Sequence, residues 1–345
     1  MSESRTDVNE LGEFGLIDQL TRDFSNQQAT TLLGIGDDAA IIGSGGEEQL
    51  VVSTDMLVEH IHFDLAYTPL KHLGYKAVVV NLSDICAMNA RPQQVTVSIA
   101  ISNRFSVEAL EELYAGIRQA CSYYGVDLVG GDTTSSTRGL IISVTAIGRA
   151  PEKRITKRST AKVGDLICIS GNLGAAYLGL QLLEREKQIY ESHPGVQPEL
   201  GEDKKYLLER QLKPEARTDM IDQFAKNDFI PTSMIDISDG LASEVFHICR
   251  QSGVGAIVEE SGVPIREDAQ LQALEFKLDP ITCALSGGED YELLFTVDPK
   301  DVDKVRFMAD IYIAGEIVEA SEGVKLHTKG GNIHPLKAQG WNHFE

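Results

Sequence analysis

The stretch GIGDDAAII (residues 34–42) places two adjacent aspartates between glycines and an apolar run. The glycines are typical of a loop that binds phosphate, but no Lys-Ser or Lys-Thr pair follows them, which excludes a P-loop. Asp beside Gly is common in solvated turns, so this stretch on its own favours a turn. Its meaning depends on whether other carboxylates take similar places along the chain.

Acidic residues recur where the surrounding sequence is apolar. Asp55 ends the strand-like LVVSTD, and Asp84 lies inside a long apolar stretch with Asn81 one helical turn away. The other carboxylates at strand ends or after glycines are Asp132, Asp236, Asp239, Glu289 and Asp290. Each alone would be interpreted as a turn or capping residue. Together they suggest a set of carboxylates that converges in the fold.

A converged set of carboxylates needs cations. Two like charges ~4 Å apart repel by roughly 4 kcal/mol at an effective dielectric constant of 20. Oxygen ligands without His or Cys partners favour Mg²⁺ or Ca²⁺ over zinc. Mg²⁺ held by carboxylates beside glycine turns is what nucleotide phosphates require, because the metal neutralises charge that would repel the acids.

Length and composition indicate a globular protein of two domains. The chain has 345 residues, 42% hydrophobic and 24% charged. The polar N-terminus MSESRTDVNE shows no secretory signal, and no apolar run approaches the ~20 residues of a membrane helix. The five cysteines are scattered through apolar runs, which fits reduced thiols. We therefore expect a cytoplasmic protein without a membrane partner.

The charge balance bears on the binding partners. A net charge of −21 argues against nucleic acid as a partner. An anionic substrate would need a metal or a local basic patch. The stretch KRITKRSTAK (153–162) could supply that patch, or it could be a solvated linker.

Periodicity predicts mixed strands and helices on both sides of a boundary after Gly148. Strands are expected over 49–55, 94–102, 126–132 and 140–148, and helices over 72–88 and 107–125. The second part restarts with strand, glycine turn and helix over 165–183 and again over 233–251, and another strand follows GGED (287–290). The charged, proline-containing segment 184–205 reads as a surface excursion.

An ordered set of motifs carries a resemblance to a known family. GIGDDAAII, VVSTDMLVEHIHF, AVVVNLSDICAMNARP, VGGDTT, IDISDGLASE and LSGGEDYELLF, in this order, resemble the thiamine-monophosphate kinases, within the superfamily of aminoimidazole ribonucleotide synthetase. The resemblance spans essentially the whole chain, from GEFGLI (12–17) to GWNHF (340–344). STDMLVEHIHF and LSGGEDYELLF are the most specific of these motifs.

The resemblance implies a two-domain fold and a reaction. An N-terminal α/β domain, assigned to residues 1–150, would bind Mg-ATP and pair its sheet with that of a second subunit in a homodimer. An α+β domain, residues 151–345, would complete the active-site cleft. The family transfers the γ-phosphoryl group of ATP to thiamine monophosphate, giving thiamine diphosphate and ADP. We expect direct in-line transfer with several Mg²⁺ ions and without a phosphoenzyme.

The resemblance also implies site residues. The metal ligands would be Asp38, Asp55, Asp84, Asp132, Asp236 and Asp239, helped by oxygens of Ser53 and Thr54, whereas Asp37 would shape the turn. ATP would contact Gly131, Asp132, Arg158, Ser238 and Tyr114. The thiamine part would contact His62, Glu289 and Trp341. Arg158 and Asp239 would support the transfer itself.

Alternative interpretations remain open at this stage. His60 and His62 would share one face of an extended segment and could bind a transition metal, but no third ligand lies nearby in the sequence. A sister enzyme of the same superfamily, such as a selenophosphate synthetase or the purine-pathway synthetase, is one rival; the early reactive Cys of the former is missing, since no Cys precedes Cys86. A non-catalytic acidic protein that binds Mg²⁺ or Ca²⁺ is the other.

Overall fold

A computed structural model of the chain describes residues 12–193, 196 and 200–337, and it is built around two β-sheets. The first sheet has the strand order β1-β2-β3-β6-β4-β5. Its strands are β1 (Thr31–Leu33), β2 (Ala40–Ile42), β3 (Glu48–Val58), β4 (Arg91–Ile101), β5 (Asp127–Ser135) and β6 (Ile141–Pro151). Neighbouring strands are antiparallel except β4 and β5.

The second sheet, formed by the later part of the chain, has the order β13-β12-β9-β11-β7-β10-β8. Its strands are β7 (Leu166–Ser170), β8 (Ser233–Ile237), β9 (Gly255–Glu259), β10 (Glu292–Val297), β11 (Ile311–Val318), β12 (Val324–His327) and β13 (Ile333–Pro335). The helices are α1 (Gly12–Thr21), α2 (Leu70–Ala87), α3 (Val107–Tyr124), α4 (Ala175–Ser192), α5 (Lys205–Leu212), α6 (Thr218–Lys226), α7 (Leu241–Ser252), α8 (Glu267–Glu275), α9 (Pro280–Ser286) and α10 (Val302–Arg306).

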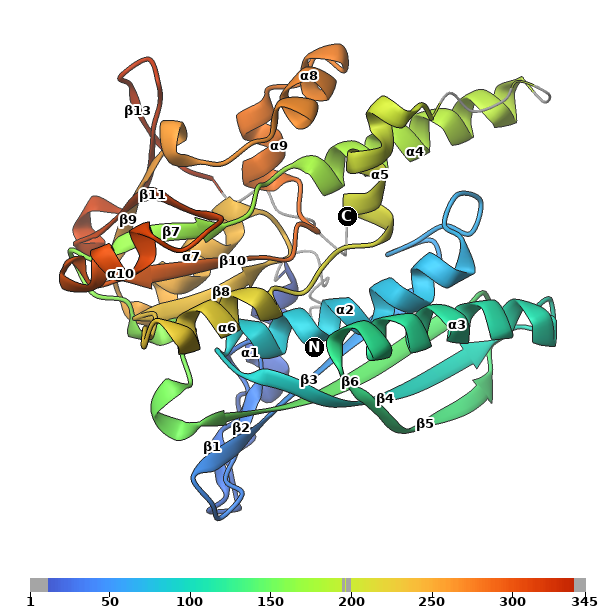
Figure 1. Cartoon of the computed structure of the whole chain (residues 1–345), viewed down its shortest axis with the longest axis horizontal. Helices are drawn as coiled ribbons and strands as arrows, with labels where there is room; N and C mark the ends of the chain where they lie inside the picture. The colour runs from blue at the N-terminus through green and yellow to red at the C-terminus, as the bar shows by residue number, and fades with distance from the viewer. Residues whose placement is uncertain (1–11, 194–195, 197–199, 338–345) are drawn as a thin grey trace, which may run out of the picture.

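Helices α2 and α3 cover one face of the first sheet (Figure 1). The predicted helix over 72–88 is confirmed as α2, and it is buried on almost every side because it also packs against β8 and α5. The predicted helix over 107–125 is confirmed as α3, which ends at Gly125 with a left-handed φ of 65°. Glycine at this position relieves the steric cost of that conformation.

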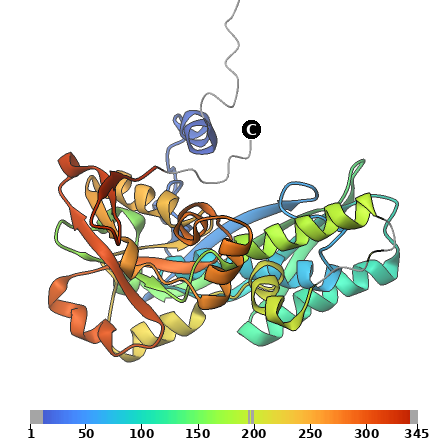
Figure 2. The same cartoon turned by 90° about the horizontal axis from the view of Figure 1, so that it is seen from above.

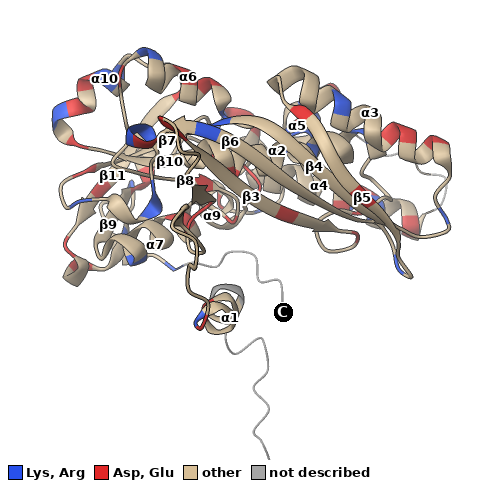
Figure 3. Ribbon diagram, turned by 90° about the horizontal axis from the view of Figure 1, so that it is seen from below, with Lys and Arg blue, Asp and Glu red and all other residues tan. Residues whose placement is uncertain are grey.

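The other face of the first sheet carries no helix from the described part of the chain (Figure 3). On β4 and β6 the buried Val95, Val97 and Val144 point toward the helices, while the alternating Thr96 and Thr145 stay partly exposed. The edge strand β5 is exposed along its whole length, with Val129 57% exposed. An open face and an exposed edge of this kind are places where another sheet can pair.

The structure revises two expectations about segments. Residues 184–205 are only partly a surface excursion, because α4 continues to Ser192 and α5 begins at Lys205. The basic stretch 153–162 is not a solvated linker. Thr156 is buried, the carbonyl of Lys157 accepts a hydrogen bond from the N–H of Met234 (3.3 Å), and Arg154 donates to the carbonyl of Phe229 (2.8 Å). The stretch joins the two sheets through specific contacts.

One apolar cluster joins the two halves of the molecule. Val79 and Leu82 of α2 lie in the same buried cluster as Phe224 of α6, Met234 of β8 and Phe295 of β10. Figure 2 shows the two halves side by side along the long axis of the molecule. Across the described residues, no helix is both long and apolar enough to cross a membrane.

Candidate active site

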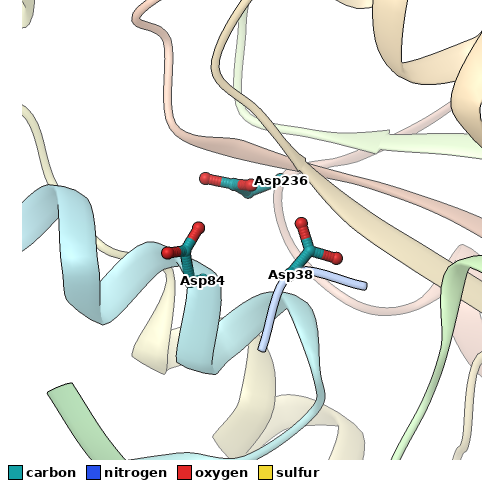
Figure 4. Close-up of side chains that lie close together, drawn as sticks. All are labelled: Asp38, Asp84 and Asp236. Carbon is teal, nitrogen blue, oxygen red and sulfur yellow. The ribbon is translucent and has the colours of Figure 1, made fainter. Parts of the chain in front are cut away.

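Three carboxylates from distant parts of the sequence meet where the two halves join. Asp38 lies before β2, Asp84 on α2 and Asp236 on β8, and ligand oxygens of all three lie within 4.8 Å of one another (Figure 4). Asp38 and Asp236 are buried. The apolar sequence around each aspartate therefore reflects its position at the end of, or within, a buried element.

Burial and mutual repulsion disfavour ionisation of this trio. Burial first, and then the charge of Asp38, raise the pKa of Asp236 to about 7. Burial and the neighbouring Asp55, Asp236 and Asp38 raise the pKa of Asp84 well above its usual range. The Ser83 hydroxyl donates to Asp236 (2.6 Å), and the Ser53 hydroxyl donates to Asp84. An oxygen-only donor set that is costly to ionise without a cation fits Mg²⁺.

Arg158 places a cation against the trio. Its guanidinium donates two hydrogen bonds to the carboxylate of Asp38, one of them from Nε at 2.9 Å. Its backbone N–H donates to Asp37 (3.3 Å), and the backbone N–H of Asp38 also donates to Asp37 (3.1 Å). Burial first, and then Asp38, raise the pKa of Asp37 to about 7. Asp37 thus holds the turn, and Asp38 faces the site.

The predicted ligands on β3 point to different faces of the sheet. Ser53 and Asp55 face α2, where Asn81 Oδ1 accepts a hydrogen bond from the Asp55 backbone N–H (3.0 Å). The Thr54 hydroxyl instead donates to the carbonyl of Val144 on β6 (3.0 Å). Strand alternation therefore brings Ser53 and Asp55 toward the trio and turns the Thr54 side chain away.

The loop after β8 carries Ser238 and Asp239, and a buried glutamate holds it. Glu244 of α7 accepts hydrogen bonds from the backbone N–H groups of Asp239 (2.9 Å) and Ser238 (3.3 Å). Glu244 is 2% exposed, and burial followed by the charge of Asp239 raises its pKa well above its usual range. Glu244 is not among the residues predicted from the sequence, although an acidic residue in the apolar first turn LASEVF was the available signal.

Glu289 is held by residues from both halves of the molecule. Its carboxylate contacts Lys76 Nζ of α2 (2.9 Å) and accepts a hydrogen bond from Gln211 Nε2 of α5 (2.7 Å). Its backbone has a left-handed φ of 59°, and its N–H donates to the carbonyl of Ser238 (2.6 Å). Lys76 and Gln211 did not appear among the sequence-derived candidates.

The histidine segment does not match its expected conformation. β3 ends at Val58, and residues 60–62 form a turn in which His60 has a φ of 69°, so the expectation of an extended segment was wrong. His62 Nδ1 accepts a hydrogen bond from the backbone N–H of Val58 (3.0 Å), while His60 contacts Glu59 and Asp64 at 3.6 Å. Trp341 lies outside the described residues.

A second group of candidates lies at the edge of the first sheet. Gly131 and Asp132 are on β5, and Tyr114 lines a cavity of about 600 Å³ between α3 and the start of β5. A Cβ on Gly131 would lie 1.9 Å from the carbonyl oxygen of Val97, so only glycine fits against β4 there. β5 lies three strand spacings from β3, about 14 Å along the sheet. Asp132 therefore does not join the trio of its own chain.

Matches to family models and to known proteins define the class of protein to which this chain belongs. The family models described as AIR synthase related protein, N-terminal domain, and AIR synthase related protein, C-terminal domain, match residues 36–150 and 162–327. The thiamine-monophosphate kinase of Aquifex aeolicus is 33% identical over 337 residues, covering 98% of this chain and 99% of the relative. That of Buchnera aphidicola subsp. Schizaphis graminum is 35% identical over 341 residues, covering 97% and 99%.

Solved structures agree with this relationship. A structure described as AaThiL complexed with AMPPCP and TMP superposes with a TM-score of 0.83 at 31% identity, covering 99% of this chain and 100% of that one. The chain belongs to the thiamine-monophosphate kinase family. The resemblance inferred from the motifs and the two-domain fold it implied are both confirmed.

Proposed function

We propose that this protein phosphorylates thiamine monophosphate with ATP, producing thiamine diphosphate and ADP. The observation that carries the proposal is the trio of Asp38, Asp84 and Asp236, which meets Arg158 at the junction of the two halves. Relatives over nearly the full length are thiamine-monophosphate kinases. An oxygen-rich acidic site with the partly buried Arg158 beside it suits the transfer of a phosphoryl group between two polyanions.

The trio and its neighbours fit Mg²⁺, which when bound would neutralise the charge of the nucleotide phosphates. The metal ligands would come from Asp38, Asp55, Asp84, Asp236 and Asp239, with oxygens of Ser53 and Thr54. The Thr54 hydroxyl donates to the carbonyl of Val144 on the opposite face of the sheet, so Thr54 fits this ligand set less well than Ser53.

The acceptor phosphate is already ionised at neutral pH, so the transfer needs no strong general base. Alignment and charge compensation therefore carry most of the rate enhancement. Arg158 would exchange its two bonds with Asp38 for a phosphate oxygen as Mg-ATP enters. Ser238 would contact ATP, and Glu244 would keep Ser238 and Asp239 in place through their backbone N–H groups. His62, Glu289 and Trp341 would bind the thiamine part.

We infer that the protein works as a homodimer in which the first sheet pairs with that of a second copy. Residues 1–150 would form the domain that dimerises and binds Mg-ATP, and residues 151–345 would complete the cleft. The open sheet face and the exposed β5 support this pairing. Since Asp132 lies about 14 Å from β3 along its own sheet, it would complete the site of the second subunit, together with Gly131 and Tyr114.

The cellular context follows from the same observations. We propose a cytoplasmic enzyme, because all five cysteines are free thiols and such thiols are typical of reducing compartments. The partners would be ATP and thiamine monophosphate, and the net charge of −21 opposes nucleic acid.

The decisive experiment is an ATP-to-ADP assay in parallel with thiamine monophosphate, with unphosphorylated thiamine and without an acceptor, each with and without Mg²⁺. We expect turnover only with thiamine monophosphate and Mg²⁺. Conversion of ATP to ADP at the same rate with and without thiamine monophosphate would point to a sister enzyme of the superfamily. Mg²⁺ binding without any turnover would identify a non-catalytic cation-binding protein.

A further inference from the structure

A buried lysine sits behind the carboxylate assigned to the substrate. Lys76 is 3% exposed in the apolar helix α2, and its Nζ contacts Glu289 Oε1 (2.9 Å) and donates to the backbone carbonyl of Gln211 (3.2 Å). A buried ammonium group is costly unless it is paired and hydrogen-bonded. A lysine kept at this place in an apolar helix therefore has a specific partner, which is Glu289.

The Glu289 carboxylate is arranged to accept hydrogen bonds from a ligand. Lys76 contacts Oε1, and Gln211 Nε2 donates to Oε2 (2.7 Å), so each oxygen has one protein partner and keeps a free lone pair. The Glu289 side chain is 28% exposed, whereas that of Lys76 is 4% exposed. The lysine is thus behind the carboxylate, and the carboxylate reaches solvent.

The position of Glu289 ties this carboxylate to the transfer site. Its backbone N–H donates to the carbonyl of Ser238 (2.6 Å), the residue before Asp239. Lys76 belongs to the first half of the chain and Gln211 to the second, so the acceptor is complete only when both halves are docked. Thiamine monophosphate carries an aminopyrimidine whose N–H groups can donate to such a carboxylate.

We propose that Lys76 is a positioning residue for thiamine monophosphate, holding the Glu289 carboxylate oriented toward the aminopyrimidine. This inference rests on the proposed function. A lysine that served only to join the two halves would stabilise the fold without affecting one substrate more than the other.

The test compares Lys76→Met with Lys213→Met in the full-length protein. Lys213 is the control, because it is also a lysine that contacts α2. Its Nζ lies 5.1 Å from the ring centre of Tyr75, the residue before Lys76. Hydrogen bonds to charged groups contribute about 1.5–3 kcal/mol, so we expect Lys76→Met to raise KM for thiamine monophosphate by about 10- to 150-fold. KM for ATP should change by less than about threefold, and Lys213→Met should leave both constants near wild type.

A double-mutant cycle with Glu289→Gln separates the two levels of inference. If Lys76 acts through Glu289, the double variant should show the KM of Glu289→Gln alone. An unchanged KM in Glu289→Gln would remove Glu289 from the substrate site and overturn the inference about Lys76, whereas a lack of turnover with thiamine monophosphate in the wild-type protein would overturn the proposed function itself. A raised KM in Glu289→Gln combined with no effect, or a fully additive effect, of Lys76→Met would overturn the role of Lys76.

A second variant covers the case in which Lys76→Met does not fold. Gln211→Leu removes the donor to Glu289 Oε2 and keeps the Gln211 carbonyl that Lys76 contacts. We expect a raised KM for thiamine monophosphate only, with a melting temperature close to wild type. A folded Gln211→Leu protein with an unaltered KM would contradict the proposal that protein donors orient this carboxylate.

Discussion

The contact between Arg158 and Asp38 shows how an arginine of the chain can compensate part of the negative charge of the carboxylate trio. The guanidinium neutralises the Asp38 charge through two hydrogen bonds. Burial lowers the pKa of Arg158, but the nearby charge of Asp38 and the other acidic groups raise it by more. The pKa of Arg158 therefore lies above its usual range. Arginine suits this role because its planar fork matches a carboxylate as well as a phosphate.

We predict that Arg158→Ala lowers kcat/KM for ATP by about 10- to 150-fold, the range expected for loss of hydrogen bonds to a charged group. Lys153→Ala is the appropriate control, because Lys153 is exposed in the same basic stretch. Arg154 would be a poor control, since it donates to the carbonyl of Phe229. Steady-state kinetics at saturating Mg²⁺ measure the difference, and equal, small effects at Arg158 and Lys153 would contradict a role in ATP binding.

A second prediction concerns Asp290, which is fully buried and accepts a hydrogen bond from the backbone N–H of Gly174 (2.7 Å) before α4. Burial, partly offset by Arg210, raises its pKa to about 7. Between pH ~4 and ~7 the folded protein therefore binds a proton that the unfolded chain has released, so this group's contribution to stability falls as pH rises.

Asp290→Asn should consequently gain stability over wild type as pH rises from 5 to 8, by about 2–3 kcal/mol, or roughly two units at 1.36 kcal/mol per pKa unit. Asparagine keeps an oxygen that can accept from Gly174. Chemical denaturation at several pH values measures the effect. Asp279→Asn is the control, because Asp279 also caps a helix but at an exposed site. A stability difference between Asp290→Asn and wild type that does not vary with pH would contradict the raised pKa of Asp290.

At the element scale, α2 and α3 cross with their backbones almost touching. A Cβ on Gly74 would lie 2.0 Å from the carbonyl oxygen of Leu113, and a Cβ on Gly116 would lie 1.9 Å from that of Lys71. The two glycines thus allow each helix to approach the other at the same crossing. This close approach keeps α2, and with it Asp84, against the first sheet.

We predict that Gly116→Ala destabilises the protein by about 1–3 kcal/mol or more, because the helices must separate. The sign of the change in unfolding free energy is informative. In an ordinary helix interior, alanine would be favoured over glycine by about 1 kcal/mol. Gln119→Ala, at an exposed position of α3, should be near neutral. Urea denaturation of both variants checks this, and a stabilised Gly116→Ala would contradict the close crossing.

Sequence patterns predicted these elements unequally. The long apolar run identified α2, and Gly125 marked the end of α3, because local composition determines both features. Periodicity could not show that residues 184–192 continue α4, because charged residues suit an exposed helix face as well as a surface excursion. It also could not reveal Lys76 or Glu244, because each gains its role from a partner that only the tertiary fold brings near.

At the scale of the whole molecule, the proposed dimer makes a distinctive prediction. Asp132→Asn and Asp239→Asn homodimers should both be inactive, because each lacks a proposed ligand in both sites. Mixing and re-equilibrating equal amounts should restore about one quarter of wild-type activity, since half the dimers are mixed and each has one intact site. Activity that stays absent in verified mixed dimers would mean that Asp132 serves the site of its own subunit.

The apolar cluster shared by α2, α6, β8 and β10 bears on how such a protein could be recombined. Val79 and Leu82 pack in the same core as Phe224 and Phe295. If the two halves were separated, each would therefore expose apolar side chains to water. A chimera that joins the first half of one relative to the second half of another would have to match side chains on both sides of α2. Grafting the halves as interchangeable modules should therefore fail unless α2 and its neighbours are transferred together.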